Sequence, residues 1–166
     1  MNSDPQFNVT KLDTFPKLLL HNIKKRGDSP AMREKGYGIW QSWTWSEAGD
    51  QIFSLACGIL ELGIKKGDKV AIIGDNRPSL YWAMTACQIL GGIPVPMYQD
   101  AVAEETKFVL EHAEVRVAIV EDQEQVDKLI ATKDQLPKLE FIIYSDPRGL
   151  DYYEHTFLFK LDDVQK

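Results

Sequence analysis

Residues 66–98 read KGDKVAIIGDNRPSLYWAMTACQILGGIPVPMY, and the order of strand-like and helical patterns within them indicates the fold class. The run 70–73 is short and wholly apolar, which is typical of a strand buried on both faces. A helical pattern begins at Pro78 and ends at a pair of glycines. The second apolar run, 93–97, contains two prolines that cannot donate to a ladder, so we expect it at a sheet edge or a strand end.

The alternation of strand-like and helical segments continues along the chain. It gives a helix at 101–112, a strand at 115–120, a helix at 122–132 and a strand at 141–144. This β-α-β-α-β-α-β order predicts an α/β fold with a mostly parallel sheet and helices on both faces. Residues 158–166 hold one more apolar segment and what resembles a helix start, so we expect the chain to stop inside a larger domain.

A helix and a β-hairpin are expected before the sheet. The polar residues 1–13 are predicted to be flexible, and an apolar stripe over 14–25 predicts a helix with Thr14 as its cap. Weak alternation over residues 31–43, around a Gly-Tyr-Gly sequence, predicts a hairpin with aromatic cross-strand partners, including Trp40 and Trp43.

A capping box, TWSE at residues 44–47, opens the next helix, which Gly63 ends. Helical spacing predicts which side chains of this helix face the core: Ala48, Ile52, Leu55, Ala56, Ile59 and Leu60. The same reasoning applied to the helix at 101–112 selects Val102, Thr106, Val109 and Leu110.

Composition is that of an ordinary globular protein. The 166 residues are 44% hydrophobic and carry a net charge of −6, so no global basic field attracts nucleic acid. The basic run 24–26 is interpreted as a solvated helix end, with a phosphate or membrane contact as the alternative. The longest apolar stretch, 80–97, is too interrupted to span a bilayer, so we expect a cytoplasmic protein, with peripheral membrane contact left open. Cys57 and Cys87 are interpreted as small buried hydrophobic residues.

The chain lacks the common catalytic and cofactor motifs. It has no G-x-x-x-x-G-K-[ST] loop, no G-x-G-x-x-G after a strand and no G-x-S-x-G elbow. The turn 74–78 is a poor anion site, because Asp75 repels anions and Pro78 removes a donor. The three histidines, His21, His112 and His155, lack metal spacing. The carboxylate clusters at 104–105, 121–124 and 162–163, two of them at helix starts, are interpreted as charges that suit helix dipoles, with paired general acid–base catalysis as the alternative. We therefore assign no catalytic, cofactor-binding or metal residue.

Several segments resemble the N-terminal region of the adenylate-forming (AMP-binding) enzyme superfamily. They occur in the same order and at the same spacing: TWSE at 44–47, LGIKKGDKVAI at 62–72, NRP at 76–78 and GGIPVPMY at 91–98. The NRP turn, the terminal tyrosine and EDQEQVDK at 121–128 are similar to the long-chain fatty acyl-CoA synthetase branch. The resemblance covers about residues 14–153.

The resemblance implies that the parent enzyme activates a fatty acid with ATP and Mg²⁺ to an acyl-adenylate and transfers it to coenzyme A. The family's phosphate-binding loop, acidic motifs and catalytic lysine lie downstream of the matched region, and this chain contains none of them. Residues 14–166 would then be part of the large N-terminal domain, cut before that loop and inactive alone. Their partner would be the rest of the same chain, and a homodimer is left open.

Three residues are the candidates for a substrate path. Asn76 and Arg77 follow the end of a strand, where parallel sheets place ligands, and Tyr98 follows another. In the whole enzyme they would stand near the acyl or coenzyme A path; the alternative is turn and core packing. Other functions stay open: a medium-chain acyl-CoA ligase, a fatty acyl-AMP ligase, a reductase's adenylation domain, or a non-catalytic binding module.

Overall fold

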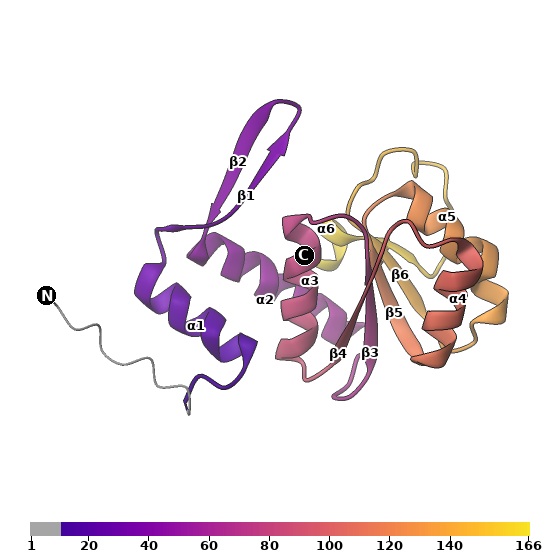
Figure 1. The fold of residues 1–166 in the computed structure, drawn as a ribbon, viewed down its shortest axis with the longest axis horizontal. Coiled ribbons are helices and arrows are strands. Elements are labelled where there is room, and N and C mark those ends of the chain that lie inside the picture. The colour runs from indigo at the N-terminus through magenta and orange to yellow at the C-terminus, as the bar shows by residue number, and fades with distance from the viewer. Residues whose placement is uncertain (1–10) are drawn as a thin grey trace, which may run out of the picture. The chain divides into compact units, whose positions relative to one another are not determined.

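The computed structural model describes residues 11–166, so most of the predicted flexible segment 1–13 lies outside the described residues. The chain divides into two compact units, Met1–Asp50 and Gln51–Lys166. The first unit holds helix α1, a hairpin and the start of helix α2, and the second holds a five-stranded sheet with its helices (Figure 1). That residues 14–166 form part of one domain stays a prediction.

The helix and hairpin predicted in the first unit are confirmed. Helix α1 spans Phe15–Arg26, and Thr14 caps it by accepting a hydrogen bond from Lys17 N. Strands β1 (Pro30–Gly36) and β2 (Ile39–Thr44) pair antiparallel. The two tryptophans of β2 do not face aromatic partners: Trp40 lies opposite Lys35, and Trp43 lies opposite Met32.

The predicted capping box is present at the start of α2 (Trp45–Glu61). Glu47 N donates to Thr44 Oγ1 over 3.2 Å, and Thr44 N donates to Glu47 Oε2 over 2.8 Å. In the second unit, the apolar stripe of α2 is buried at Ile52, Leu55, Ala56 and Ile59. Leu60 is exposed, against the prediction, because it lies just beyond the edge of that stripe.

The sheet is wholly parallel, as the alternation predicts. Its order is β4-β3-β5-β6-β7, with bounds Ile93–Met97, Lys69–Ile73, Val115–Val120, Phe141–Tyr144 and Leu158–Lys160. The proline-containing strand β4 lies at one edge, as expected. Strand β4 follows β3 in the sequence and pairs on one side of β3, whereas the next strand, β5, pairs on the other side of β3. Such a switch in direction is where open α/β sheets place ligands, at the carboxyl ends of the strands.

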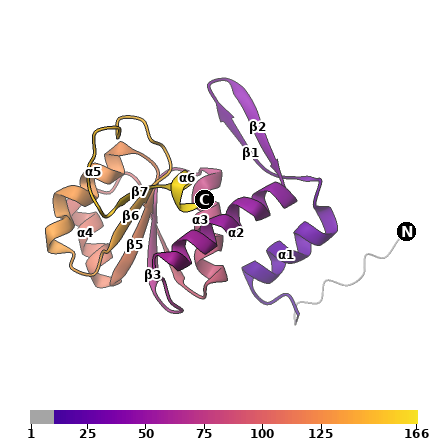
Figure 2. The ribbon, with the colours of Figure 1, turned by 180° about the vertical axis from the view of Figure 1, so that it is seen from behind.

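Helices cover both faces of the sheet (Figures 1 and 2). Helix α3 (Pro78–Ile89) packs on β3 and β4, and helices α4 (Ala103–His112) and α5 (Gln123–Thr132) lie on the opposite face. A 3-10 turn, Lys133–Gln135, follows α5, and the short helix α6 spans Leu161–Val164. No helix within residues 11–166 is both long and apolar enough to cross a bilayer.

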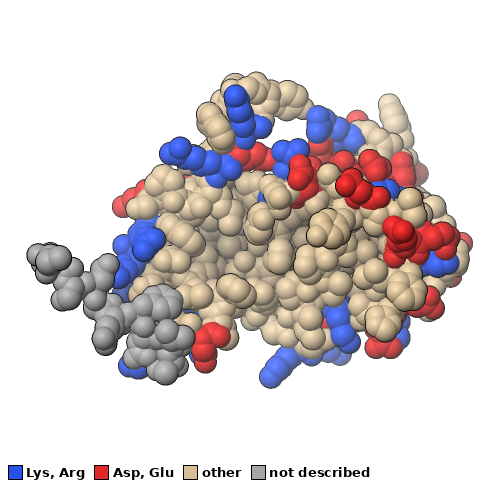
Figure 3. Space-filling view, in the orientation of Figure 1, with Lys and Arg blue, Asp and Glu red and all other residues tan. Residues whose placement is uncertain are grey.

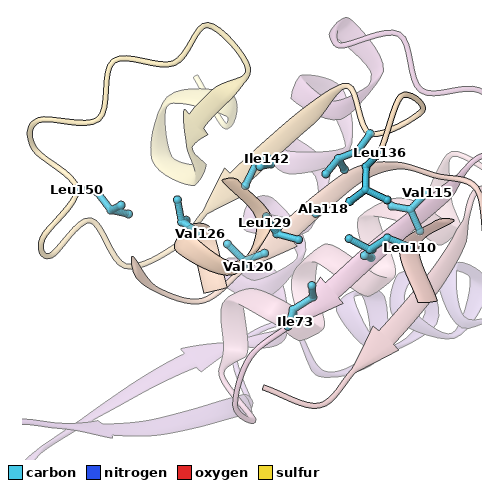
Figure 4. Close-up of a cluster of buried hydrophobic side chains, with 12 residues drawn as sticks. Ile73, Leu110, Val115, Ala118, Val120, Val126, Leu129, Leu136, Ile142 and Leu150 are labelled. Carbon is cyan, nitrogen blue, oxygen red and sulfur yellow. The ribbon is translucent and has the colours of Figure 1, made fainter. Parts of the chain in front are cut away.

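The core lies between the central strands and helices α4 and α5 (Figure 4). It includes Ile73, Val120, Val126, Leu129 and Ile142, all at most 1% exposed. In α4, Thr106 and Leu110 are buried as predicted. Val102 is exposed, against the prediction, because it is the N-cap residue and lies outside the helical stripe. Cys87 is buried, but Cys57 is exposed and is not the core residue we predicted.

Candidate functional site

A cavity of about 570 Å³ opens at the carboxyl ends of β3 and β4. This volume is in the range of small-molecule sites, roughly 300–1,000 Å³. Apolar side chains make up much of its lining: Ile72, Leu80, Tyr81, Met84, Met97 and Tyr98. The polar lining comes from two loops, one at 74–76 after β3 and one at 98–100 after β4.

The loop after β3 is fixed by Glu121. Parallel register sets Ile73 beside Val120, so the next residue, Glu121, lies against this loop. Its Oε2 accepts a hydrogen bond from Asp75 N over 2.5 Å, and its Oε1 accepts one from Arg77 Nε over 2.8 Å. The Glu121 side chain is only 12% exposed, so these hydrogen bonds are partly shielded from water.

Gly74 allows this close approach. A Cβ at position 74 would lie 2.5 Å from Glu121 Cβ and 2.7 Å from Leu80 Cδ1. The residue also has a φ of +154°, which side chains rarely adopt. The loop therefore needs glycine for both space and backbone conformation.

The loop after β4 is fixed by Lys128. Its Nζ donates to the carbonyl of Gln99 over 2.6 Å and to Gln125 Oε1 over 3.3 Å. It also pairs with Glu124 at 2.8 Å, and its side chain is mostly buried. Glu121 and Lys128 belong to one segment, so residues 121–128 hold both loops that line the cavity.

Two of the three candidate residues line this cavity. Asn76 and Tyr98 come from its two loops, and Asn76 Oδ1 accepts a hydrogen bond of 3.0 Å from Tyr81 Oη. Tyr98 is 88% exposed. Arg77 is not among the lining residues; its guanidinium pairs with Glu121 instead. The structure thus brings Asn76 and Tyr98 together and gives Arg77 a position that supports the loop.

Sequence reasoning did not single out Glu121 or Lys128 as site residues. Both occur in the quoted EDQEQVDK segment, but the sequence indicates for Glu121 only a carboxylate cluster beside a helix start. The register of the parallel strands would have indicated Glu121, because the residue that follows one buried strand lies beside the residue that follows the neighbouring strand.

The cavity does not suit phosphate groups. Its charged lining residues are Asp75 and Asp100, and no lysine or arginine occurs among the described residues that line it. Carboxylates repel the phosphates of ATP or coenzyme A, so these residues do not fit either group. An uncharged apolar moiety fits the cavity better.

Metal-site geometry is absent from the described part of the chain. No group of three or more His, Cys, Asp or Glu side chains among residues 11–166 could hold a metal ion. Two histidines stack on phenylalanines instead, His112 on Phe108 and His155 on Phe157. These two residues have packing contacts that account for their positions.

Comparison with known families gives one match that covers most of the chain. The AMP-binding enzyme family matches residues 19–161. Among curated proteins, the long-chain-fatty-acid–CoA ligase ACSBG2 of Xenopus laevis is 30% identical over 134 residues, which cover 80% of this chain and 18% of that protein. The long-chain-fatty-acid–CoA ligase FadD15 of Mycobacterium tuberculosis is 31% identical over 150 residues, covering 87% of this chain and 25% of that protein.

Solved structures agree on the fold. The anthranilate–CoA ligase AuaEII, crystallised with anthranoyl-AMP, superposes with a TM-score of 0.78 at 18% identity. The match covers 90% of this chain and 27% of that structure. At this identity the similarity shows the fold alone. The chain thus spans about a fifth to a quarter of the length of these curated relatives.

Proposed function

The chain belongs to the family of AMP-binding, adenylate-forming enzymes, which use ATP, and we propose that it is part of a long-chain-fatty-acid–CoA ligase. The observation that carries the proposal is that relatives about 30% identical over four fifths or more of the chain bear that name. The NRP turn, Tyr98 and the segment 121–128 support the same branch.

The proposed overall reaction joins a fatty acid to coenzyme A through an acyl-adenylate. ATP is consumed to give AMP and pyrophosphate, and Mg²⁺ is the metal cofactor. Residues 14–166 would form the N-terminal part of the adenylation domain. The chain has no Ser/Thr/Gly-rich phosphate-binding loop. The proposal therefore assigns the chemical steps to residues outside this chain, and assigns to this chain a scaffold and part of the acyl-binding site.

The cavity would hold part of the hydrocarbon chain of the fatty acid, on the acyl path. An apolar lining with two carboxylates favours a hydrocarbon chain over the phosphates of coenzyme A. Asn76 and Tyr98 would line this path, while Arg77 would support it through Glu121. This narrows the sequence-based hypothesis, which left the acyl and coenzyme A paths equally open.

The test is a substrate panel on the product of the complete coding sequence. Palmitate, octanoate and anthranilate are each assayed for acid-dependent pyrophosphate release, with and without coenzyme A. Palmitate-dependent release that yields palmitoyl-CoA supports the proposal. Preference for octanoate or anthranilate overturns the long-chain assignment. Palmitoyl-adenylate that accumulates despite coenzyme A identifies a fatty acyl-AMP ligase, and no release with any acid favours a binding module.

The cavity's role has a separate test in the same protein. Replacing Met84 by Trp fills the cavity, because Met84 is one of its lining residues. If the cavity holds the acyl chain, the variant loses activity with palmitate more than with octanoate. An equal effect on both acids would remove the cavity from the acyl path and leave the ligase assignment standing.

A further inference from the structure

Three large apolar side chains are exposed together at the tip of the first unit's hairpin. Tyr37 is 90% exposed, Ile39 is 70% exposed and Trp40 is 65% exposed. They are nearly consecutive, and the two-stranded sheet β1-β2 has no third strand among residues 11–166. Single exposed apolar residues are ordinary, but three of them at the end of one hairpin, a tryptophan included, are typical of an interaction surface.

The turn itself holds a residue of unusual type. Tyr37 and Gly38 have φ values of 50° and 82°, which make a two-residue turn with both central residues in the left-handed region. Such turns favour Asn or Gly at the first position, since a Cβ there crowds the following carbonyl oxygen; Gly has none, and the short polar side chain of Asn can hydrogen-bond locally. An aromatic residue kept in this conformation, and directed into solvent, is better explained by a contact it makes than by folding.

Basic side chains lie beside the apolar tip. The register sets Lys35 opposite Trp40 and Arg33 opposite Ser42, and alternate residues of a strand share a face, so both cations lie on the Trp40 face. Residues 14–44 contain six Lys and Arg but two Asp and Glu, although the whole chain has a net charge of −6. Figure 3 shows blue basic side chains around the uncharged tip of the hairpin.

We propose that the hairpin tip is a membrane-surface anchor for anionic bilayers. Tyr37, Ile39 and Trp40 enter the interface between headgroups and acyl chains, where aromatic rings with a polar atom are most stable. Arg33 and Lys35 stay level with the anionic headgroups and add the electrostatic attraction. This anchor does not depend on the proposed ligase function.

The other occupants fit less well. Nucleic acid would need a longer basic stripe with stacking rings, and the Trp40 face carries two cations only in the described hairpin. A second copy of the chain would need about 1,200 Å² or more of buried surface for a stable dimer, which a two-stranded tip is too small to supply. A bilayer requires only shallow insertion of a few side chains.

The test is co-sedimentation of the product of the complete coding sequence, which contains any further segment able to cover the tip, with vesicles of phosphatidylcholine, with and without phosphatidylglycerol. We expect binding to the anionic vesicles that weakens with added salt. Ile39→Ser with Trp40→Ser should lower the partition coefficient about tenfold or more, because two apolar side chains are lost from the interface. Arg33→Gln and Lys35→Gln should each lower it about fivefold, on anionic vesicles only.

The matched controls are Tyr152→Ser and Phe108→Ser, which remove exposed aromatic side chains from the second unit. Both should bind vesicles like the wild type, and thermal unfolding confirms that every variant is folded. Absence of binding to anionic vesicles, which is expected if the rest of the protein covers the tip, overturns the proposal, and so does vesicle binding that the tip variants leave unchanged. So does binding of single-stranded DNA in place of vesicles, or a concentration-dependent dimer that the tip variants dissociate.

Discussion

Lys128 Nζ donates a 2.6 Å hydrogen bond to the carbonyl oxygen of Gln99, which joins helix α5 to the loop that leaves strand β4. A mostly buried lysine that donates to a backbone carbonyl fixes the loop more firmly than a contact between two flexible side chains. Glu121, which directly precedes the N-cap of α5, holds the loop after β3. Glu121 and helix α5 together therefore set the shape of the cavity.

Replacing Lys128 by Met should release the loop at 98–102. A charge-assisted hydrogen bond contributes about 1.5–3 kcal/mol, so backbone amides in this loop should exchange with solvent about tenfold faster or more. Hydrogen exchange followed by mass spectrometry measures this. Lys107→Met is the control, because Lys107 is similarly exposed and bonds Gln135 and Glu104 away from the cavity. Equal exchange in both variants would show that Lys128 does not hold the loop.

Replacing Glu121 by Gln should destabilise the second unit. The variant keeps an acceptor but loses the charge that pairs with Arg77, and its new amide group faces donors at Asp75 N and Arg77. We expect the free energy of unfolding to fall by about 1–2 kcal/mol, less than for a fully buried pair because Arg77 is partly exposed. Urea unfolding measures the change, and Glu154→Gln, at an exposed loop position, should stay within about 0.5 kcal/mol of wild type.

Replacing Gly74 by Ala should lower the free energy of unfolding more than Lys128→Met or Glu121→Gln. The added Cβ would overlap Glu121 Cβ and Leu80 Cδ1 at a backbone conformation that alanine disfavours. We expect a loss of about 2–4 kcal/mol in urea unfolding. Gly36→Ala is the control, since its Cβ would meet nothing closer than Gln41 Nε2 at 3.8 Å. A small loss at Gly74 would mean that the loop adjusts and that its shape is not fixed by Glu121.

The elements of the fold were predictable because they depend on local patterns. The apolar runs at 70–73 and 115–120, the capping box at 44–47 and the prolines of β4 each determine a conformation within a few residues. The burial of side chains at the edge of a helix's apolar stripe was harder to predict. Leu60 fits the helical spacing yet is exposed, since spacing alone does not give the width of the face that neighbours cover. Val102 is exposed because α4 begins one residue after it, and the spacing did not define that start.

The cavity was only partly predictable. The carboxyl ends of the strands pointed to Asn76 and Tyr98, and both line it. The supporting contacts of Glu121 and Lys128 depend on which strand lies beside which, and periodicity does not contain that information. Arg77 shows the same limit: its position in the turn was clear from the sequence, but its pairing with Glu121 requires β5 next to β3.

Arg116 links the amino ends of strands β3, β5 and β6. Its ion pairs should make the free energy of unfolding fall at low pH. Its guanidinium bonds Asp68 through Nη1 at 2.5 Å and Glu140 through Nη2 at 2.6 Å. The Arg116 hydrogen bonds hold the pKa of Glu140 below its ordinary value of 4.5. Burial alone would raise the pKa of Asp68, but hydrogen bonds from Lys65 N and Arg116 outweigh it and hold that pKa below 3.8.

A carboxylate whose pKa is lower in the folded state stabilises the fold above its unfolded pKa, and this stability is lost as the pH falls through the folded value. The wild type should therefore lose stability below about pH 4.5. Arg116→Gln should lower the free energy of unfolding by about 1–2 kcal/mol at pH 7 and flatten this acid dependence. Urea unfolding at several pH values measures both. Lys107→Gln, which removes an i,i+3 pair with the exposed Glu104, should leave the acid dependence nearly intact.

The two cysteines should differ sharply in reactivity, although neither sequence context separates them. Burial raises the pKa of the Cys87 thiol to about 12, so it is almost wholly protonated at pH 8, and its side chain is out of reach of reagent. Cys57 is exposed on α2. We expect one thiol per folded chain to react with a disulfide reagent within minutes and the second to react only in urea. Cys57→Ser should abolish the fast phase, whereas Cys87→Ser should keep it. A fast phase that survives Cys57→Ser would mean that α3 opens readily, and that the cavity beside it is less fixed than its hydrogen bonds indicate.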